Sequence, residues 1–199
     1  MNVKTLVFAS RNAGKIVEIK DMLAPMNIEV KSALDLDLPD VEENGTTFAE
    51  NSLLKSQTIA RQIGLPCIAD DSGLCVEALN GGPGVYTARY APNRDFDLGM
   101  DKLLQEMKNS PIKSRKAWFC CVISLAFPDG KYELFEGRVD GMIAEQKMGH
   151  TGFGFDPVFI PDGYDCSFAQ MDKEQKNKIS HRGRAMQKFK DFLQQIRNS

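Results

Sequence analysis

Long apolar runs are absent from this sequence of 199 residues. The longest, such as residues 117–127, reach only strand length, whereas a helix that spans a membrane needs about 20 mainly apolar residues. The N-terminal residues run directly into a predicted strand and show no signal-peptide pattern. From these absences we expect a cytoplasmic protein without a membrane partner.

Histidine is scarce, and cysteine is sparse and irregularly spaced. The sequence holds two histidines and five cysteines, with no CxxC pair. This pattern suggests neither a zinc knuckle nor a disulfide framework, and it disfavours a transition-metal site built from histidines. We predict that the cysteines are core or subsurface thiols, and that any functional metal is Mg²⁺ or Mn²⁺ held by oxygen ligands. The cysteines are Cys67, Cys75, Cys120, Cys121 and Cys166.

Repeats, low-complexity tracts and Pro/Ser-rich linkers are also missing, so composition places no domain boundary. Hydrophobic residues make up 42% and charged residues 26%, which is typical of a soluble globular protein long enough to bury a core. The formal net charge is −2, yet residues 171–199 carry eight Lys or Arg against three Asp or Glu. This basic segment fits nucleic-acid binding or a solvated helix face, and composition alone leaves both open.

Strand and helix patterns alternate early in the sequence, and two hairpin-like strands follow in the middle. Thr47 to Glu50 form a capping-box pattern, which predicts the start of a helix. The predicted strands are residues 5–9, 67–69, 117–127 and 132–143. Three helices are predicted: one begins after Gly14, and the other two cover about 47–63 and 183–196. This mixture predicts an α/β domain with a mixed sheet. Ligands of such sheets bind beyond the carboxyl ends of strands, where we place residues 10–15 and 70–73.

The first candidate site is the turn between the first strand and the first helix. A helix N-terminus presents unpaired N–H groups and attracts anions, and two cations and short polar side chains here would add phosphate ligands. The turn consists of Ser10, Arg11, Asn12, Ala13, Gly14 and Lys15. A P-loop is excluded because position 9 is alanine where that motif needs glycine. An ordinary N-cap with solvated cations is the competing interpretation.

The second candidate is the acidic pair Asp70 and Asp71, followed by Ser72. Two adjacent carboxylates are costly to bury together, and a bound cation would relieve that cost. One of them could then orient or deprotonate water. Upstream, Glu43 lies in another acidic turn and is a candidate second metal ligand. The competing interpretation is a pair of exposed polar turns.

A glycine-rich stretch from Gly149 to Pro157 forms the third candidate. Its order and setting differ from a dinucleotide fingerprint, which requires a strand, GxGxxG and then a helix. Phe153 or Phe155 could stack on a base, and Asp156 could accept a hydrogen bond from a ring N–H. Alternatively, the two rings fill the core beside a turn around Gly154.

The fourth candidate precedes the final helix. Ser180 is a plausible N-cap, and His181 and Arg182 would project from the first helical turn. Together with Lys176, these donors could bind a phosphate or a carbonyl oxygen of a base. A basic, solvated helix start explains the same residues.

In chain order, these motifs are Ser10-x-Asn12-x-x-Lys15, Thr47-Phe48-x-Glu50-Asn51, Ala69-Asp70-Asp71-Ser72-Gly73-Leu74, Ala88-Arg89-Tyr90, Gly152-Phe153-Gly154-Phe155-Asp156-Pro157 and Lys176-x-x-x-Ser180-His181-Arg182. Taken together, they resemble the inosine triphosphate pyrophosphatase family, also called XTP/dITP diphosphatases. The resemblance covers nearly the whole chain.

The resemblance implies a single nucleotide pyrophosphatase domain over residues 1–199. Its expected fold is a two-lobed α/β domain, with a long mixed β-sheet flanked by helices and an active-site cleft between the lobes. The implied activity is Mg²⁺-dependent hydrolysis of ITP, dITP and XTP to the monophosphate and pyrophosphate, which clears deaminated purines. A homodimer is also implied, and nucleic acid is not an expected partner.

The resemblance also implies roles for individual residues. Asp71 matches a proton acceptor and metal ligand, Glu43 a second metal ligand, and Ser72 a substrate contact. Whether Asp70 or Asp71 takes the proton stays open. The turn from Ser10 to Lys15 matches the triphosphate-binding segment. The nucleotide-binding residues of the second half are matched by Phe153, Gly154, Phe155, Asp156, Lys176, His181 and Arg182.

These roles predict selectivity for the base. Donors from His181 or Arg182 facing O6, with Asp156 facing N1–H, would be left unpaired against adenine, at about 1–3 kcal/mol per group. Nothing in the sequence explains how guanine is excluded. Position 155 is Phe where the family often has Tyr, and position 10 is Ser where Thr is common.

Two other functions remain as alternatives. One is a pyrophosphatase of related fold that acts on modified or pyrimidine triphosphates. The other is a non-catalytic nucleotide-binding protein. Three acids near a phosphate ligand argue against mere binding, since a phosphate binder gains nothing from them.

Overall fold

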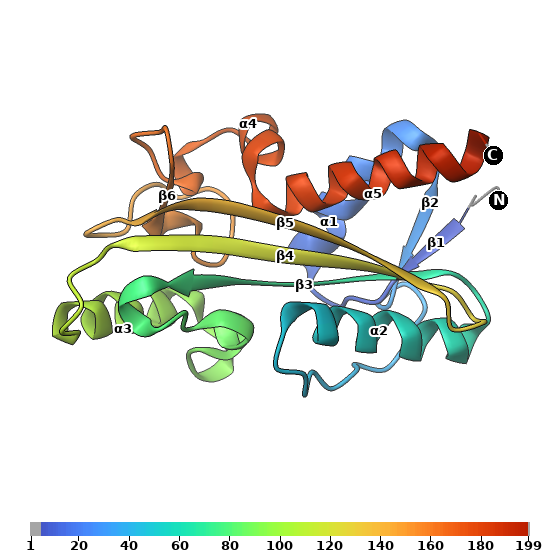
Figure 1. Cartoon of the computed structure of the whole chain (residues 1–199), viewed down its shortest axis with the longest axis horizontal. Helices are drawn as coiled ribbons and strands as arrows, with labels where there is room; N and C mark the ends of the chain where they lie inside the picture. The colour runs from blue at the N-terminus through green and yellow to red at the C-terminus, as the bar shows by residue number, and fades with distance from the viewer. Residues whose placement is uncertain (1–4, 199) are drawn as a thin grey trace. The chain divides into compact units, whose positions relative to one another are not determined.

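The computed structural model of the chain describes residues 5–198. They form a mixed six-stranded sheet in the order β2-β1-β3-β4-β5-β6, flanked by helices (Figure 1). The strands are β1 (Thr5–Phe8), β2 (Glu29–Ser32), β3 (Cys67–Val76), β4 (Lys116–Ala126), β5 (Tyr132–Ile143) and β6 (Phe159–Pro161). The helices are α1 (Ala13–Leu23), α2 (Phe48–Ile63), α3 (Phe96–Asn109), α4 (Lys173–Ile179) and α5 (His181–Asn198), with short 3₁₀ turns between elements.

The chain divides into two compact units. The described part of the first unit consists of residues 5–71, 122–136 and 185–198, and the second consists of residues 72–121 and 137–184. Three strands, β3, β4 and β5, and the last helix contribute residues to both units. The boundary in β3 falls between Asp71 and Ser72, two residues that the sequence singled out.

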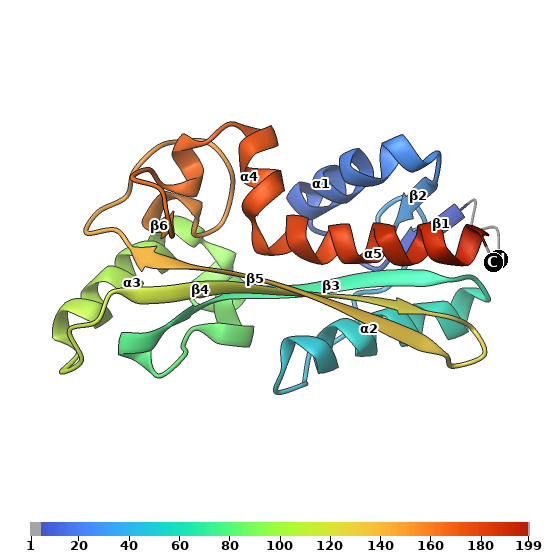
Figure 2. The same ribbon diagram turned by 45° about the horizontal axis from the view of Figure 1, so that its top comes forward.

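In the first unit, β1 pairs in parallel with β2 and with β3. Helix α2 covers one face of this part of the sheet, and α1 and α5 cover the other (Figure 2). Val7 and Ala69 from the strands pack with Ile59 and Ala60 from α2 in one apolar cluster. Burial of a large apolar side chain stabilises a fold by about 1.5–3 kcal/mol, so this cluster holds α2 on the sheet.

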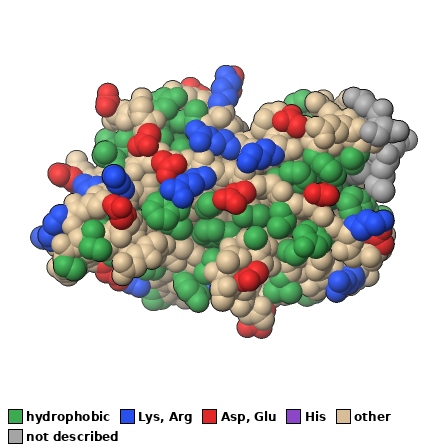
Figure 3. All heavy atoms as spheres, in the orientation of Figure 1, with side chains coloured by type: hydrophobic (Ala, Val, Ile, Leu, Met, Phe, Trp, Pro, Cys, Tyr) green, Lys and Arg blue, Asp and Glu red, His purple; other side chains and the backbone are tan. Residues whose placement is uncertain are grey.

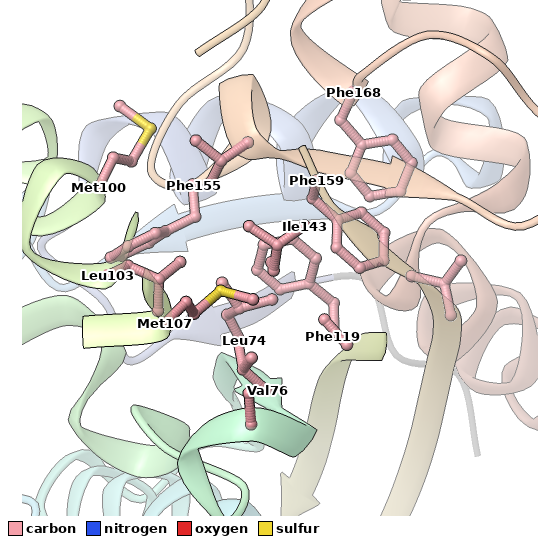
Figure 4. Packing of buried hydrophobic residues seen from close by; sticks show 14 of the residues in the cluster. Leu74, Val76, Met100, Leu103, Met107, Phe119, Ile143, Phe155, Phe159 and Phe168 are labelled. Carbon is pink, nitrogen blue, oxygen red and sulfur yellow. The ribbon is translucent and has the colours of Figure 1, made fainter. Parts of the chain in front are cut away.

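The second unit has its own aromatic core (Figure 4). Helix α3 contributes Met100, Leu103 and Met107, which repeat at helical spacing and meet the apolar residues of β3. Phe119 lies on β4, with its ring centroid 4.8 Å from that of Phe159. Along β5, buried and exposed residues alternate from Phe135 onward, as expected for a strand with one solvated face.

The structure confirms the strand at 5–8, the three predicted helices and the hairpin strands, with ends shifted by at most a few residues. The prediction of a turn at Asp70–Gly73 is wrong, because these residues lie in the middle of the ten-residue strand β3. Elements β2, α3, α4 and β6 were not predicted. None of the helices formed by the described residues combines the length and apolar character needed to cross a membrane.

Candidate functional site

The turn after β1 is ordered by its own polar side chains. Asn12 is the N-cap of α1, and its side-chain oxygen accepts a hydrogen bond from the Lys15 N–H at 3.1 Å. The Asn12 N–H in turn donates to Ser10 Oγ at 3.2 Å. Arg11 donates to the Leu38 carbonyl at 2.6 Å. The cap leaves the amides of the first helical turn at a fixed position, where an anion can bind them.

Lys15 connects this turn to β3. The strand register pairs Phe8, the last residue of β1, with Ile68 of β3, so the turn after Phe8 lies beside the residues that follow Ile68 within β3. Lys15 Nζ lies 3.1 Å from Asp70 Oδ2, and the Asp70 side chain is 1% exposed. The turn after β1 and Asp70 therefore meet, although Asp70 lies within β3 and not beyond its carboxyl end as predicted. Asp70 is compensated by an ion pair inside the first unit.

Asp71 occupies a different environment, because successive residues of a strand point to opposite faces of the sheet. It contacts α2, where the Asn51 side-chain amide donates to Asp71 Oδ2 at 3.1 Å. Burial raises the pKa of Asp71 to about 6. Lys55 opposes this shift, whereas the Glu43 carboxylate adds to it. Asp71 thus becomes a carboxylate that can exchange a proton near neutral pH.

Lys55 is the residue of this cluster that the sequence reasoning missed. It lies one helical turn after Asn51 on α2, is 9% exposed, and donates to the Asp70 carbonyl at 2.7 Å and to the Glu43 carboxylate. Burial alone would lower the pKa of Lys55, but the neighbouring carboxylates, Glu43 first, raise it overall. A sequence signal existed, since Asn51 and Lys55 interrupt the apolar stripe of α2 at i and i+4.

The acids of the first unit fit a divalent metal by their chemistry. Glu43 and Asp71 supply oxygen donors, which Mg²⁺ and Mn²⁺ prefer. The charge of Glu43 raises the pKa of Asp71, so a cation shared by both would stabilise their ionised forms. Within residues 5–198 as described, no group of three or more His, Cys, Asp or Glu side chains is gathered tightly enough to be a preformed metal site.

In the second unit, a carboxylate organises the glycine-rich loop. Asp156 Oδ2 accepts hydrogen bonds from the Phe153 N–H at 2.8 Å and from Lys176 Nζ at 2.6 Å. Gly152 has a φ of +77°, and a Cβ at this position would lie 2.2 Å from the same oxygen. Only glycine allows this close approach. The loop from Gly152 to Asp156 is therefore held in one shape.

Two cations face the ring of Phe153. Lys176 Nζ lies 4.8 Å from the ring centroid, and the guanidinium carbon of Arg182 lies 5.5 Å from it. Arg182 also donates to Ser72 Oγ at 3.0 Å. Both cations are buried, whereas Phe153 is half-buried. The unit thus brings together an aromatic face, buried donors and the first residue after Asp71.

The neighbouring rings belong to the core. Phe155 is 2% exposed, lies in the apolar cluster of Figure 4 and meets Phe96 edge to face at 6.0 Å. His181 stacks on Phe119 with centroids 4.6 Å apart. Ser180 accepts from the Gly183 N–H at 3.1 Å, which confirms the predicted cap. Of the two phenylalanines considered for base stacking, Phe153 alone presents a partly accessible ring.

The basic C-terminal segment serves several separate contacts. Lys176 and Arg182 belong to the cluster just described, and Lys178 pairs with Glu174 one turn earlier on α4. Arg184 and Lys188 donate to backbone carbonyls of β5. Figure 3 shows basic and acidic side chains interspersed over the face in view. This distribution favours the second interpretation of the segment, a helix face with local partners.

Comparison with known proteins places this arrangement in a family. The model of the Ham1 family matches residues 6–192. The chain belongs to the Ham1 family. This confirms the resemblance that the motifs indicated, and the matched range includes every candidate site residue of both units.

Relatives in the Ham1 family cover almost the whole chain. A dITP/XTP pyrophosphatase of Mesorhizobium japonicum is 45% identical and covers 94% of this chain and 91% of its own length. One from Bacillus cereus is 43% identical, with 96% of each chain covered.

Solved structures agree with the fold. The Staphylococcus aureus Ham1 protein matches with a TM-score of 0.85 at 44% identity, covering 96% of this chain and 98% of that one. A HAM1 protein from Coxiella burnetii matches with a TM-score of 0.90 at 36% identity and the same coverage. The predicted α/β fold with a mixed sheet and flanking helices is therefore confirmed.

Proposed function

We propose that this chain hydrolyses non-standard purine nucleoside triphosphates, namely dITP, XTP and ITP, to the nucleoside monophosphate and pyrophosphate. The observation that carries the proposal is the environment of the Asp71 carboxylate. This carboxylate is buried, has a pKa of about 6 and is set among Asn51, Lys55 and Glu43. Relatives that are 43–46% identical over nearly the full chain carry the name dITP/XTP pyrophosphatase. The proposed role is to clear deaminated purines from the nucleotide pool.

The first unit binds the triphosphate in this proposal. The N-terminal amides of α1 at Ala13 and Gly14 and the ammonium group of Lys15 bind phosphate oxygens. Arg11 uses one donor for Leu38 and, with five N–H groups, keeps others for a phosphate. Ser10 and Asn12 hold the turn in the required shape.

Glu43 and Asp71 would hold the divalent metal, which we propose to be Mg²⁺, with Mn²⁺ as a substitute. When bound, such an ion neutralises phosphate charge and polarises the phosphorus that is attacked. Lys55 donates hydrogen bonds to the Glu43 carboxylate and to the Asp70 carbonyl, and so keeps the acids of this cluster in place.

Asp71 is the proposed base, because Asp70 is already paired with Lys15. An Asp71 carboxylate oxygen takes a proton from a water molecule as the water oxygen bonds to the α-phosphorus. The bond between that phosphorus and the oxygen bridging to the β-phosphate breaks, and the electron pair leaves with pyrophosphate. With a pKa of about 6, Asp71 is mostly ionised at pH 7 and able to accept this proton.

The second unit selects the base in this proposal. Phe153 provides the stacking surface, and Gly154 lets the backbone approach. We propose that donors from Arg182 and His181 face O6 and that Ser72, which accepts a hydrogen bond from Arg182, contacts the substrate. Asp156 holds the loop and the Lys176 ammonium group by hydrogen bonds. We propose that it also accepts a hydrogen bond from a ring N–H of the base. A polar mismatch with adenine would cost about 1–3 kcal/mol per group.

Assembly and location complete the proposal. We infer a homodimer from the family resemblance, with a sedimentation mass twice that of one chain. We also infer a cytoplasmic location, where the nucleotide pool and reduced thiols are found; none of the five cysteines, all of which lie among the described residues, forms a disulfide.

The test is a turnover assay with Mg²⁺ on ITP, XTP, GTP and ATP, in which pyrophosphate and orthophosphate are measured separately. We expect pyrophosphate from ITP and XTP and little product from GTP or ATP. Asp71→Asn should lower kcat by roughly 10²- to 10⁴-fold, the usual contribution of a general base. Asp129→Asn, in the exposed turn between β4 and β5, is the matched control and should keep full activity.

Different products point to different errors. Orthophosphate release would contradict the reaction, and turnover of UTP or TTP above that of ITP would indicate the related-fold alternative. Binding of ITP without turnover would leave a nucleotide-binding protein. Sedimentation at the mass of one chain would refute the dimer alone.

A further inference from the structure

Three serine hydroxyls form a fully buried cluster in the first unit. Ser52 and Ser56 lie on α2 and Ser124 on β4, and the relative exposure of each is 0%. Ser124 Oγ lies 2.8 Å from the hydroxyls of both helix serines and donates to the Ser52 carbonyl at 2.8 Å. The Ser52 hydroxyl lies 3.1 Å from the carbonyl of Ala69 on β3, so its single proton is shared between this oxygen and Ser124 Oγ. The cluster therefore bonds one helix to two strands.

Its position on α2 relates it to the catalytic residues. Ser52 and Ser56 are one turn apart and form one row of the helix. Asn51 and Lys55 form the adjacent row and bond Asp71 and the Asp70 carbonyl. The two rows share a rigid backbone, so any shift of the serine row moves the other row by the same amount.

Apolar residues would hold α2 on the sheet without this cluster, as Ile59 and Ala60 do one turn later. Apolar contacts tolerate sliding, whereas buried hydroxyls lose about 1–3 kcal/mol each when they lose their partners. A hydrogen-bonded network accordingly fixes one register of helix against strand. The Ala69 carbonyl that Ser52 contacts directly precedes Asp70 in β3, so this contact fixes α2 next to the two acids.

We propose that Ser124 is a positioning residue for catalysis: through Ser52 and Ser56 it fixes α2 so that Asn51 and Lys55 meet the acids of β3. This inference rests on the proposed function. It assigns Ser124 no contact with the substrate. Its effect is on the chemical step, since a misplacement of about 1 Å can cost about 100-fold in rate.

The test compares Ser124→Ala and Ser124→Cys with a matched control. Ser52 keeps Ala69 and Ser56 keeps the Leu53 carbonyl at 3.2 Å, so Ser124→Ala is expected to fold. Ser32→Ala is the control, because Ser32 is 1% exposed, lies in the same unit and accepts a hydrogen bond from the Asp35 N–H at 3.2 Å that the variant loses. Should Ser124→Ala fail to fold, Ser56→Ala removes the second arm of the cluster.

We expect Ser124→Ala to lower kcat on ITP at least about tenfold while KM changes less than about twofold. Ser124→Cys, which keeps a weak donor and acceptor, should fall between wild type and Ser124→Ala. Ser32→Ala should also lose thermal stability but keep its kcat. An unchanged kcat in Ser124→Ala, or an equal loss in Ser32→Ala, overturns the inference.

A second readout separates this inference from the proposed function. In ¹⁵N-lysine NMR, the buried ammonium of Lys55 should give a protected signal that Lys55→Met removes. That signal should shift or exchange faster in Ser124→Ala and stay unchanged in Ser32→Ala. If wild type does not turn over ITP but the signal responds in this way, the function fails and the positioning stands. If wild type is active and the signal does not respond, the positioning fails.

Discussion

At the scale of single residues, Asp70 and Asp71 show how neighbours acquire different properties. They are consecutive in a strand, so one meets Lys15 and the other meets Asn51. Asp70 is held by an ion pair inside the first unit, whereas burial raises the pKa of Asp71 to about 6. A turn, which the sequence favoured, would have left both in solvent. Strand geometry is thus what distinguishes the two acids.

Asp35 provides the pH prediction at this scale. The Ser32 N–H donates to Asp35 at 2.8 Å and Lys20 Nζ at 2.9 Å, and the pKa of Asp35 is lowered to about 2, with the backbone bond as the larger cause. The folded pKa lies below the unfolded value near 3.8, so its stabilisation is present above pH 4 and is lost as the pH falls towards 2.

Carboxyl ¹³C NMR titration measures this pKa directly. Lys20→Met should raise the pKa of Asp35 but leave it below normal, because the Ser32 bond remains. Lys31→Met, which removes a surface pair with Glu29, is the control and should leave Asp35 unchanged. A wild-type pKa near 4 would contradict the prediction.

At the scale of elements, α2 depends on its capping box. Thr47 Oγ1 accepts from the Glu50 N–H at 3.1 Å, and the Glu50 carboxylate accepts from the Thr47 N–H at 3.1 Å. Thr47→Ala should lower the free energy of unfolding by about 1 kcal/mol in urea titrations. Thr58→Ala, at an exposed position of the same helix, should be neutral or slightly stabilising, because alanine has the higher helix propensity. Equal effects of both variants would refute the role of the box.

Local signals account for what the sequence could predict. Patterns among neighbouring residues predict the Thr47 capping box, the β4–β5 hairpin and the apolar stripe of α5. The predicted strand at 67–69 is shorter than β3 because two Asp and a Gly after it locally favour a turn. In the structure β3 continues to Val76, because Lys15, Asn51 and Lys55, which are distant in sequence, compensate the buried acids. The polar interruption of the α2 stripe at Asn51 and Lys55 is a local signal that a buried polar position exists, but it does not show that Lys55 faces carboxylates, which come from distant parts of the sequence.

At the scale of the whole molecule, the sheet must protect its outer strand. In the described part of the chain, β6 pairs only with Gly141–Ile143, so the rest of β5 has no strand on that side. Two cations one turn apart on α5 bond its outward carbonyls: Arg184 reaches that of Arg138 at 2.8 Å, and Lys188 reaches that of Glu136 at 2.7 Å. Unpaired edges invite pairing with another chain, and basic side chains prevent it.

Removing this protection should cause self-association. We expect the double variant Arg184→Ala, Lys188→Ala to form larger species by sedimentation velocity, at concentrations where wild type keeps one mass, because its edge carbonyls become available to a second β5. The loss of exposed hydrogen bonds alone would cost only about 1 kcal/mol each, so the variant should still fold. Lys108→Ala, Lys178→Ala removes the same charge from exposed positions elsewhere and should match wild type. Equal association of both double variants would attribute the effect to net charge and refute edge protection.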